Sequence, residues 1–235
     1  MECCEQQLGT HAQPAVLRVG LLGGPAYWAW VNRPVGGHPR FFGPDWMEQL
    51  TKTPWWVVPC LWLPLHLACA ALAHSRYGMQ LPQLAVLLVA GVLLWQLLEY
   101  TIHRFVFHAH LTSYWGITLH FLFHGCHHKY PMDSQRLVMP PLPALGVHAL
   151  VYGALRATLP IQVAVPLFAG AGLGYIAYDC LHYAIHHLKG NSRLARVALQ
   201  PLRQKHLHHP FKNCRAGFGI SSPLFDYVFQ TLSGV

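Results

Sequence analysis

Two long stretches without charged side chains constrain the fold of this chain more than any other feature. Residues 55–73 contain no Asp, Glu, Lys or Arg, and residues 81–100 contain none except Glu99. An α-helix needs about 20 predominantly apolar residues to cross the hydrocarbon core of a bilayer. The short connection between the two stretches holds Arg76 and Tyr77. The pattern therefore predicts a hairpin of two membrane-spanning helices, over residues 55–74 and 81–99.

The composition agrees with a membrane protein. Of the 235 residues, 53% are hydrophobic and only 10% are charged, which does not suit the surface of a water-soluble domain. Membrane topology and anionic lipid explain the formal net charge of +8, and no basic and aromatic motif indicates a nucleic-acid partner. The seven cysteines are odd in number and scattered, so they favour a reduced, cytosolic face without a disulfide framework.

Two further apolar segments predict a second hairpin, over residues 143–159 and 161–178. If both hairpins enter the bilayer from the same side, only Arg76 and Arg156 lie in the far loops, which leaves fourteen of the sixteen Lys and Arg on the near side. The positive-inside rule then places the near side in the cytosol. We therefore expect an all-α integral membrane protein with four transmembrane helices in two hairpins and a cytosolic helical cap.

The parts outside the predicted spans differ in composition. Residues 1–45 are rich in Gly and Pro and show no helical period, so we expect an irregular cytosolic arm at the membrane surface. One membrane-embedded domain follows, over residues 46–235. Asp45 is the expected N-cap of a short interfacial helix that carries Trp46 and Leu50. Residues 179–235 are polar and basic, and we expect them to form a soluble cap.

Thirteen of the eighteen histidines gather near the polar ends of the predicted spans. They form four groups, namely His103 and His108; His110, His120, His124, His127 and His128; His182, His186 and His187; and His206, His208 and His209. Neutral imidazole is the commonest metal ligand, and two histidines three or four residues apart lie on one face of a helix. Burying so many imidazoles without a shared partner would cost about 1–3 kcal/mol for each unpaired group. The groups therefore predict a metal centre.

The acidic residues limit which metal chemistry is available. Di-iron centres of the ferritin type need about four Glu, but only Glu99, Asp133 and Asp179 lie near a histidine group. The ligands must therefore be almost all imidazole. Glu99 and Asp179 are placed to accept the far N–H of a ligand ring, and a salt bridge with Arg104 or a lysine is the alternative. A single zinc site needs three or four ligands, so the larger number of histidines favours two metal ions.

Four sequence blocks together resemble the fatty acid 2-hydroxylases of the fatty acid hydroxylase and sterol desaturase superfamily. The blocks are HRFVFH, HFLFHGCHHKYPMDSQRLVMPP, YDCLHYAIHH and KHLHHPFKNCRAGFGISSPLFDYVF, and the likeness covers about residues 38–233. The resemblance implies a non-haem di-iron monooxygenase of the endoplasmic reticulum membrane with a cytosolic active site. Such an enzyme uses O2 and electrons from NAD(P)H, through cytochrome b5 and its reductase, to hydroxylate C2 of long or very long acyl chains of sphingolipids or ceramides.

The resemblance also implies a ligand set. Its metal ligands fall on His103, His108, His124, His127, His128, His182, His186, His206 and His209. Pro210 stands where relatives have one more histidine, so His208 is a possible substitute, and His187 is a further possible ligand. His110 and His120 are expected behind the ligands or in the core. Zinc can occupy histidine sites in place of iron. The arm is too short to be a fused cytochrome b5 domain, so we expect a separate cytochrome b5.

Other functions remain open at this point. A desaturase or a sterol-modifying oxidase of the same superfamily is the nearest alternative, and a histidine-rich zinc transporter is a more remote one. Transporters place ionisable residues at the middle of the membrane. Here only His66, His148 and His74 fall near or within predicted spans. For an acyl substrate, we expect the carboxyl-derived end to lie beside Lys129, Arg136 and the metal ions.

Overall fold

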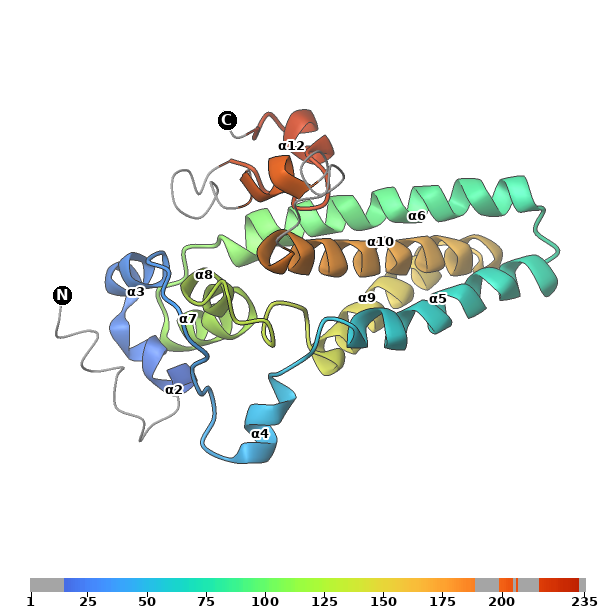
Figure 1. Ribbon diagram of the computed structural model, residues 1–235. Helices are drawn as coiled ribbons and strands as arrows, with labels where there is room; N and C mark the ends of the chain where they lie inside the picture. Colours follow the sequence, from blue (N-terminus) through green and yellow to red (C-terminus); the bar gives the residue numbers. More distant parts are fainter. Residues whose placement is uncertain (1–14, 189–198, 205, 207–215, 233–235) are drawn as a thin grey trace.

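The computed structural model describes residues 15–188, 199–204, 206 and 216–232, and these residues contain helices and loops but no β-strand. Four long helices form an elongated bundle, and shorter helices lie at one end of it (Figure 1). The histidine-bearing helices are the short ones that carry His103, His120, His124, His127 and His128. The predicted all-helical class is therefore confirmed.

The bundle consists of α5 (Val57–Ser75), α6 (Leu81–Ile102), α9 (Pro141–Thr158) and α10 (Ile161–His187). Within the described residues, three helices are long and apolar enough to cross a membrane, namely α5, α6 with its continuation to Phe107, and α10. Helix α9 forms in the expected place but is not among these three, and it carries His148 and Arg156. A fourth membrane span therefore stays a prediction.

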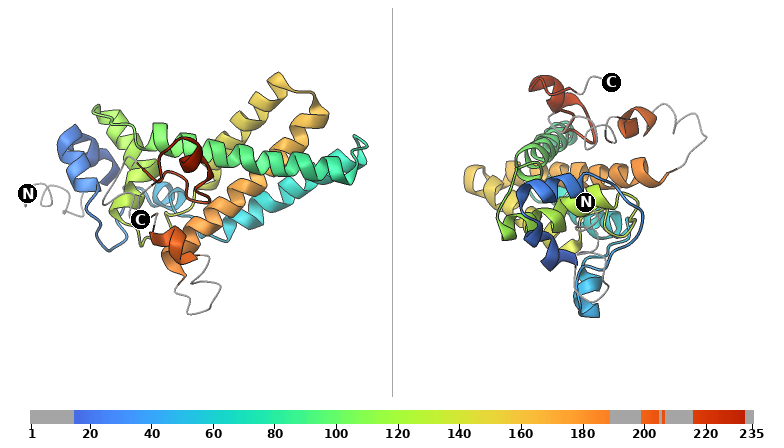
Figure 2. Two further views of the ribbon diagram at one scale, coloured as in Figure 1. Left: turned by 90° about the horizontal axis from the view of Figure 1, so that it is seen from above. Right: turned by 90° about the vertical axis from the view of Figure 1, so that its left-hand side faces the viewer.

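Helix α10 lies at the centre of the bundle, where it packs along α6 and α5. Gly91 of α6 and Gly170 of α10 face each other, and a Cβ on Gly170 would lie 2.2 Å from the Leu88 carbonyl oxygen. Glycine at this crossing lets the two backbones touch, as small residues do between membrane helices. Both hairpins turn at the end of the bundle that points away from the histidine-bearing helices (Figures 1 and 2), as the predicted topology requires.

A buried pair of histidines joins α5, α9 and α10 far from the histidine groups in sequence. His66 is fully buried, and its Nε2 lies 3.0 Å from Nε2 of His148. The Trp62 ring stacks on His148 with 4.1 Å between centroids, and a Cβ on Gly172 would meet the His66 ring at 1.9 Å. The contact between the two Nε2 atoms, together with the stacking and close packing around it, joins three helices.

Helix α10 extends nine residues beyond the expected end of its span, from residue 178 to His187. Its last two turns carry His182 and His186, so these two residues of the expected cap stand on the helix that continues from the last predicted span. Charge and histidine content suggested a boundary at Asp179, but Asp179 is buried and the helix continues through it. The third histidine group therefore stands on the same rigid helix that forms the core of the bundle.

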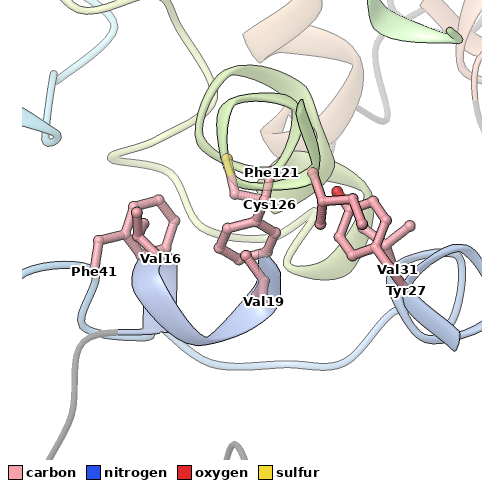
Figure 3. Packing of buried hydrophobic residues seen from close by; sticks show 8 residues of the cluster. Val16, Val19, Tyr27, Val31, Phe41, Phe121 and Cys126 are labelled. Atoms are coloured by element: carbon pink, nitrogen blue, oxygen red, sulfur yellow. The ribbon is translucent and has the colours of Figure 1, made fainter. Parts of the chain in front are cut away.

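The expected irregular arm is also wrong for its described part. Residues 15–31 form α2 (Ala15–Val19), the 3₁₀ helix η1 (Gly20–Leu22) and α3 (Gly24–Val31), with a proline in the first turn of α3. Buried side chains of these helices pack against Phe41, Phe121 and Cys126 (Figure 3). Proline is favoured in a first helical turn. Packing against the histidine-bearing helices, rather than a period in the sequence, explains why these short helices form.

The short helix α4 (Asp45–Leu50) confirms the helix expected before the first span. Asp45 is its first residue rather than its N-cap, which is Pro44, and the Asp45 carboxylate pairs with Arg40. Trp46 and Leu50 are exposed. An apolar exposed face beside the first span suits a helix that rests at the membrane interface.

The remaining short elements lie between the long helices or follow them. They are η2 (His103–Phe107), α7 (Tyr114–His120), η3 (Phe121–Gly125), α8 (Cys126–Lys129) and α12 (Leu224–Val228). Ser113 caps α7, because its Oγ accepts a hydrogen bond from the Gly116 N–H. Helix α12 packs against α6.

Candidate metal centre

Seven histidines from distant parts of the sequence meet in two clusters. In the inner cluster, one ring nitrogen of each member lies within 4.8 Å of the others, and all four members are buried, namely His127, His182, His186 and His206. In the outer cluster the same limit holds for three members, namely His103, His108 and His124. His108 is half-exposed, whereas the other two are buried.

The outer cluster depends on a wide helical turn. Helix α6 continues into η2, a π-helix in which the His108 N–H donates to the His103 carbonyl oxygen at 3.1 Å. In an α-helix, residues five apart are rotated about 140° from each other. The π turn removes most of that rotation and brings the two Nε2 atoms to 3.1 Å. Such turns are frequent at functional sites.

A second π-helix, η3, leads into α8 and serves both clusters. His124 of η3 belongs to the outer cluster, and its Nε2 lies 2.8 Å from Nε2 of His128 on α8. His127, the neighbour of His128, belongs to the inner cluster. The short segment from His124 to His128 thus connects the two clusters, and His128 extends the outer one.

The inner cluster has the chemistry of a metal site. The Nε2 atoms of His127, His182 and His206 lie 3.2–3.3 Å from one another. Three neutral rings in such a triangle cannot all be paired, because each Nε2 either carries one hydrogen or offers one lone pair. The Nε2 of His186 is buried and has no hydrogen-bond partner among the described residues. A cation shared by the four nitrogens satisfies all of them, so the donor set fits a metal ion.

The electrostatic environment keeps the imidazoles neutral. Burial, together with the neighbouring imidazoles, holds the pKa of His127 and His206 well below the usual value for histidine. The same two causes lower the pKa of His124 in the outer cluster. Neutral imidazole is the form that binds metal. Both clusters are therefore prepared for metal near neutral pH.

Two rings of the outer cluster are oriented from outside the histidine groups. His103 Nδ1 donates to the Phe218 carbonyl oxygen at 2.6 Å, and His128 Nδ1 donates to Asn32 Oδ1 at 3.3 Å. With the hydrogen on Nδ1, the lone pair is on Nε2, which faces the cluster. Neither Phe218 nor Asn32 was expected at the site.

Contrary to expectation, Glu99 accepts no hydrogen bond from a ring nitrogen among the described residues. Its carboxylate accepts hydrogen bonds from the N–H groups of Ile220 and Ser221, at 2.7 and 2.9 Å, and from the Ser221 hydroxyl. Asp226 accepts from the N–H groups of Phe218 and Gly219 at 2.9 and 2.8 Å. The two carboxylates hold the turn that presents the Phe218 carbonyl to His103. Glu99 thus acts on the outer cluster through the backbone.

The expected contact of Asp179 is also wrong. Its carboxylate accepts from the Met139 N–H at 3.2 Å, whereas His182 Nδ1 has no partner among the described residues. Asp179 is turned toward the loop that precedes α9. The alternative of a salt bridge fails for both acids within the described residues, because Arg104 donates to the Tyr100 hydroxyl at 2.6 Å instead. Asp133 forms an ion pair with Arg136.

The remaining candidate histidines lie outside both clusters or outside the described residues. His120 uses both nitrogens, because Tyr27 donates to its Nδ1 at 2.5 Å and its Nε2 donates to the Phe107 carbonyl at 2.6 Å. His187 stacks on Tyr183, and His110 is exposed beside Trp28. Three expected positions lie outside the described residues, namely His208, His209 and Pro210.

A largely apolar cavity of about 430 Å³ leads to both clusters. Its walls include the apolar side chains of Phe41, Trp46 and Leu142, and also His124, His127, His182 and Asp179. Arg136 also lines it, but its guanidinium is paired with Glu48 and Asp133. The Lys129 ammonium donates to the carbonyls of Trp30 and Arg33 and does not line the cavity, so its expected place is wrong.

A separate cavity of about 350 Å³ reaches the outer cluster at His108. His108 is the one member of the two clusters among its walls, which also include Asn32, Arg104 and Phe218. This opening explains why His108 is half-exposed. The outer cluster therefore borders two cavities, one at His124 and one at His108.

Comparisons with known proteins agree with this geometry. A family model described as fatty acid hydroxylase matches residues 88–231. The dihydroceramide fatty acyl 2-hydroxylase FAH1 of Arabidopsis thaliana is 42% identical over 222 residues, which cover 94% of this chain and 91% of that protein. The fatty acid 2-hydroxylase of Rattus norvegicus is 40% identical over 247 residues, which cover 97% of this chain and 65% of the rat protein.

A solved structure has the same fold. The structure of full-length scs7p, in which only the hydroxylase domain is visible, superposes with a TM-score of 0.87 at 35% sequence identity. The superposition covers 99% of this chain and 89% of that one. The arrangement of helices described above is therefore shared with a solved hydroxylase domain.

Proposed function

Because this chain belongs to the fatty acid hydroxylase family, we propose that it is a membrane-bound fatty acid 2-hydroxylase that acts on the acyl chains of ceramides or other sphingolipids. The names of the relatives support this substrate class, since they describe a dihydroceramide fatty acyl 2-hydroxylase and a fatty acid 2-hydroxylase. The similarity extends over most of the chain and includes both clusters.

The observation that carries the proposal is the apolar cavity that ends at both clusters. A hydrocarbon chain lying against Phe41, Trp46 and Leu142 has its inner end beside ring nitrogens of His124, His127 and His182. Ligand pockets of this kind are mostly apolar with a few convergent polar groups. The cavity therefore suits a long acyl chain better than a compact polar substrate.

Nine histidines would hold two metal ions in this proposal, namely His103, His108, His124, His127, His128, His182, His186, His206 and His209. Bound iron would supply the activation of O2 that hydroxylation requires. The chain itself keeps the imidazoles neutral by burial, fixes the rings of His103 and His128, and lines the approach with apolar side chains that exclude water.

The polar groups that line the cavity favour reaction near the acyl head. Asp179 is the acid there, and Arg136 is neutralised by its two carboxylate partners. An acyl amide can therefore approach without meeting an unpaired cation. The carbonyl-derived end then lies beside the clusters, and C2 is the first carbon that can be oxidised. Within the proposal, the electrons come from a separate cytochrome b5.

The proposal also includes a location in the endoplasmic reticulum membrane with both clusters facing the cytosol. A reporter glycosylation site near Gly78 lies in the loop between α5 and α6, and one near Asp133 lies beside the clusters. We expect modification only at the first. Modification near Asp133 would contradict the topology.

The test of the function is lipid analysis of cells that lack 2-hydroxylated sphingolipids and express this chain. We expect 2-hydroxy acyl chains in ceramide, with the hydroxyl position assigned by mass spectrometry, and no product from His127→Ala. His187→Ala is the matched control, because His187 lies on the same end of the bundle but outside both clusters. A mid-chain double bond or a hydroxylated sterol as the product would contradict the proposal.

A further inference from the structure

In the described part of the N-terminal arm, the Asn32 side chain forms a hydrogen bond to the outer cluster, at His128. We propose that Asn32 is a positioning residue, which holds His128 for the outer metal ion and makes the arm part of the metal centre. The inference rests on the proposal that the clusters hold metal, but not on the identity of the lipid substrate.

The hydrogen bonds of Asn32 fix which of its atoms faces His128. Its Nδ2 donates to the Trp28 carbonyl oxygen at 3.1 Å, one turn back on α3. The amide oxygen therefore points the other way, where it accepts from His128 Nδ1 at 3.3 Å. Because an amide oxygen only accepts, the shared hydrogen belongs to His128.

The backbone around Asn32 is tied to the residue that follows His128. The buried Lys129 ammonium donates to the carbonyl oxygens of Trp30 and Arg33, at 3.2 and 2.8 Å, and lies 4.7 Å from the centre of the Trp30 ring. The Val35 N–H donates to the Lys129 carbonyl at 2.8 Å. These bonds add to the bond that the Arg33 N–H donates to the Trp30 carbonyl at 3.2 Å, and they tie the C-terminal end of α3 to Lys129. Asn32 and His128 are thus fixed on both sides of their contact.

The consequence of this contact reaches the cluster through the His128 ring. With its hydrogen on Nδ1, the ring offers the Nε2 lone pair, and this Nε2 lies 2.8 Å from Nε2 of His124. An acceptor on the far nitrogen fixes the tautomer and raises the basicity of a ligand histidine. Loss of such an acceptor typically weakens metal binding by about 10- to 100-fold.

Helix α3 offers a matched control. Tyr27 is likewise hydrogen-bonded to a histidine, as the donor to His120, but both nitrogens of that ring are engaged away from the clusters. The Tyr27 ring packs in the apolar core between the arm and the histidine-bearing helices, together with Phe121 and Cys126 (Figure 3). Tyr27→Phe keeps the ring and removes the hydrogen bond. It therefore disturbs the packing of the arm without changing a cluster member.

The experiment measures metal release from the purified full chain in detergent. Wild type, Asn32→Leu, Asn32→Asp and Tyr27→Phe are loaded with iron or zinc, and loss of metal to a chelator is followed by elemental analysis. For Asn32→Leu we expect one of two ions to leave about 10- to 100-fold faster, with the other ion retained. Asn32→Asp keeps an acceptor oxygen, so its release should be no faster than that of wild type. Tyr27→Phe should lower the melting temperature and leave release unchanged.

Several outcomes separate this inference from the proposed metal centre. If wild type binds two ions and Asn32→Leu releases both at the wild-type rate, Asn32 has no positioning role. Equal acceleration in Tyr27→Phe, or fast release from Asn32→Asp, would assign the effect to packing of the arm and overturn the inference. If wild type binds no metal, the metal centre itself is wrong. If Asn32→Leu does not fold, Asn32→Ala, which also removes the acceptor oxygen, takes its place with the same expected and contradicting results.

Discussion

The inner and outer clusters differ in what holds them. All four members of the inner cluster are buried, and two of them stand on α10 at the core of the bundle. The outer cluster is open at His108, and the Phe218 carbonyl and Asn32, which orient its rings, come from near the two ends of the chain. Half of the inner cluster thus stands on the central helix of the bundle, whereas the groups that orient the outer cluster come from segments that pack onto it.

This difference predicts unequal stability of the two metal sites. Local opening of a packed terminal segment costs less free energy than opening of the core. We therefore expect the outer ion to exchange first, and the predictions below test whether the two sites can be separated in this way.

The largest effect should come from removing a ligand of the inner cluster. His182→Ala leaves the nitrogens of His127 and His206 without their shared neighbour on α10. We expect loss of at least one metal ion and at least a roughly 100-fold loss of 2-hydroxy product, because removing a ligand costs more than removing its supporting partner. Elemental analysis and lipid mass spectrometry measure both. Normal metal content and a normal amount of product would show that the inner cluster is not part of the active centre.

The second prediction concerns pH and the metal-free protein. Burial lowers the pKa of His120, beside the outer cluster, to about 4, against 6.5 in the unfolded chain. Below pH 6.5 the unfolded chain binds a proton at His120 that the folded chain does not. The contribution of the neutral His120 ring to the free energy of unfolding is therefore fully present above pH 6.5 and is lost as the pH falls toward 4. It amounts to at most about 3 kcal/mol. Thermal unfolding of the chain and of His120→Gln between pH 7 and 4 measures it. If the melting temperature falls with pH equally steeply in both proteins, His120 is not the source of the pH dependence.

Glu99→Gln should affect the outer cluster and spare the inner one. The buried carboxylate accepts three hydrogen bonds from the turn that carries the Phe218 carbonyl, and both of its oxygens take part. A glutamine side chain has only one acceptor oxygen, so it cannot replace both carboxylate oxygens. We expect a loss of stability of about 2 kcal/mol, in the range for hydrogen bonds to charged groups. Release of one metal ion should also become faster. Asp226→Asn, which weakens the same turn, is the comparison, and an effect on both ions would break the distinction between the clusters.

The smallest effect should come from Pro210→His, at a position outside the described residues. Proline has no imidazole and restricts the residue before it to extended backbone geometry. If His208 has replaced the ligand absent here, His208→Ala should lose as much metal as His209→Ala, and Pro210→His should change little. If His208 has no role, Pro210→His should be tolerated or slow metal release a few-fold. Full activity of both alanine variants would show that His208 and His209 are not part of the site.

The sequence predicted the features that depend on local pattern. The spans over residues 55–74 and 81–99 match α5 and the main part of α6, because long apolar runs identify them directly. Seven of the expected ligands meet in the two clusters, because their spacing and the family resemblance identify histidines. The continuation of α10 past residue 178 was not predicted, because a change from apolar to polar residues does not end a helix.

The contacts that orient the rings had no sequence signal. The carbonyl of Phe218 is a backbone group, which any residue carries. Asn32 lies 96 residues from His128, in a segment whose helix forms by packing. His103 and His108 are five residues apart, so a rule based on 3.6 residues per turn separates them, and only the π turn of η2 brings them together.

The most direct test of two cooperating clusters is an iron titration of the metal-free chain. Product is measured as 2-hydroxy ceramide with O2 and reduced cytochrome b5 in excess, while iron is added in steps. The inner cluster should fill first, so we expect little product up to one iron per chain and a plateau at two. A plateau at one iron per chain, or product that does not depend on iron, would contradict the account.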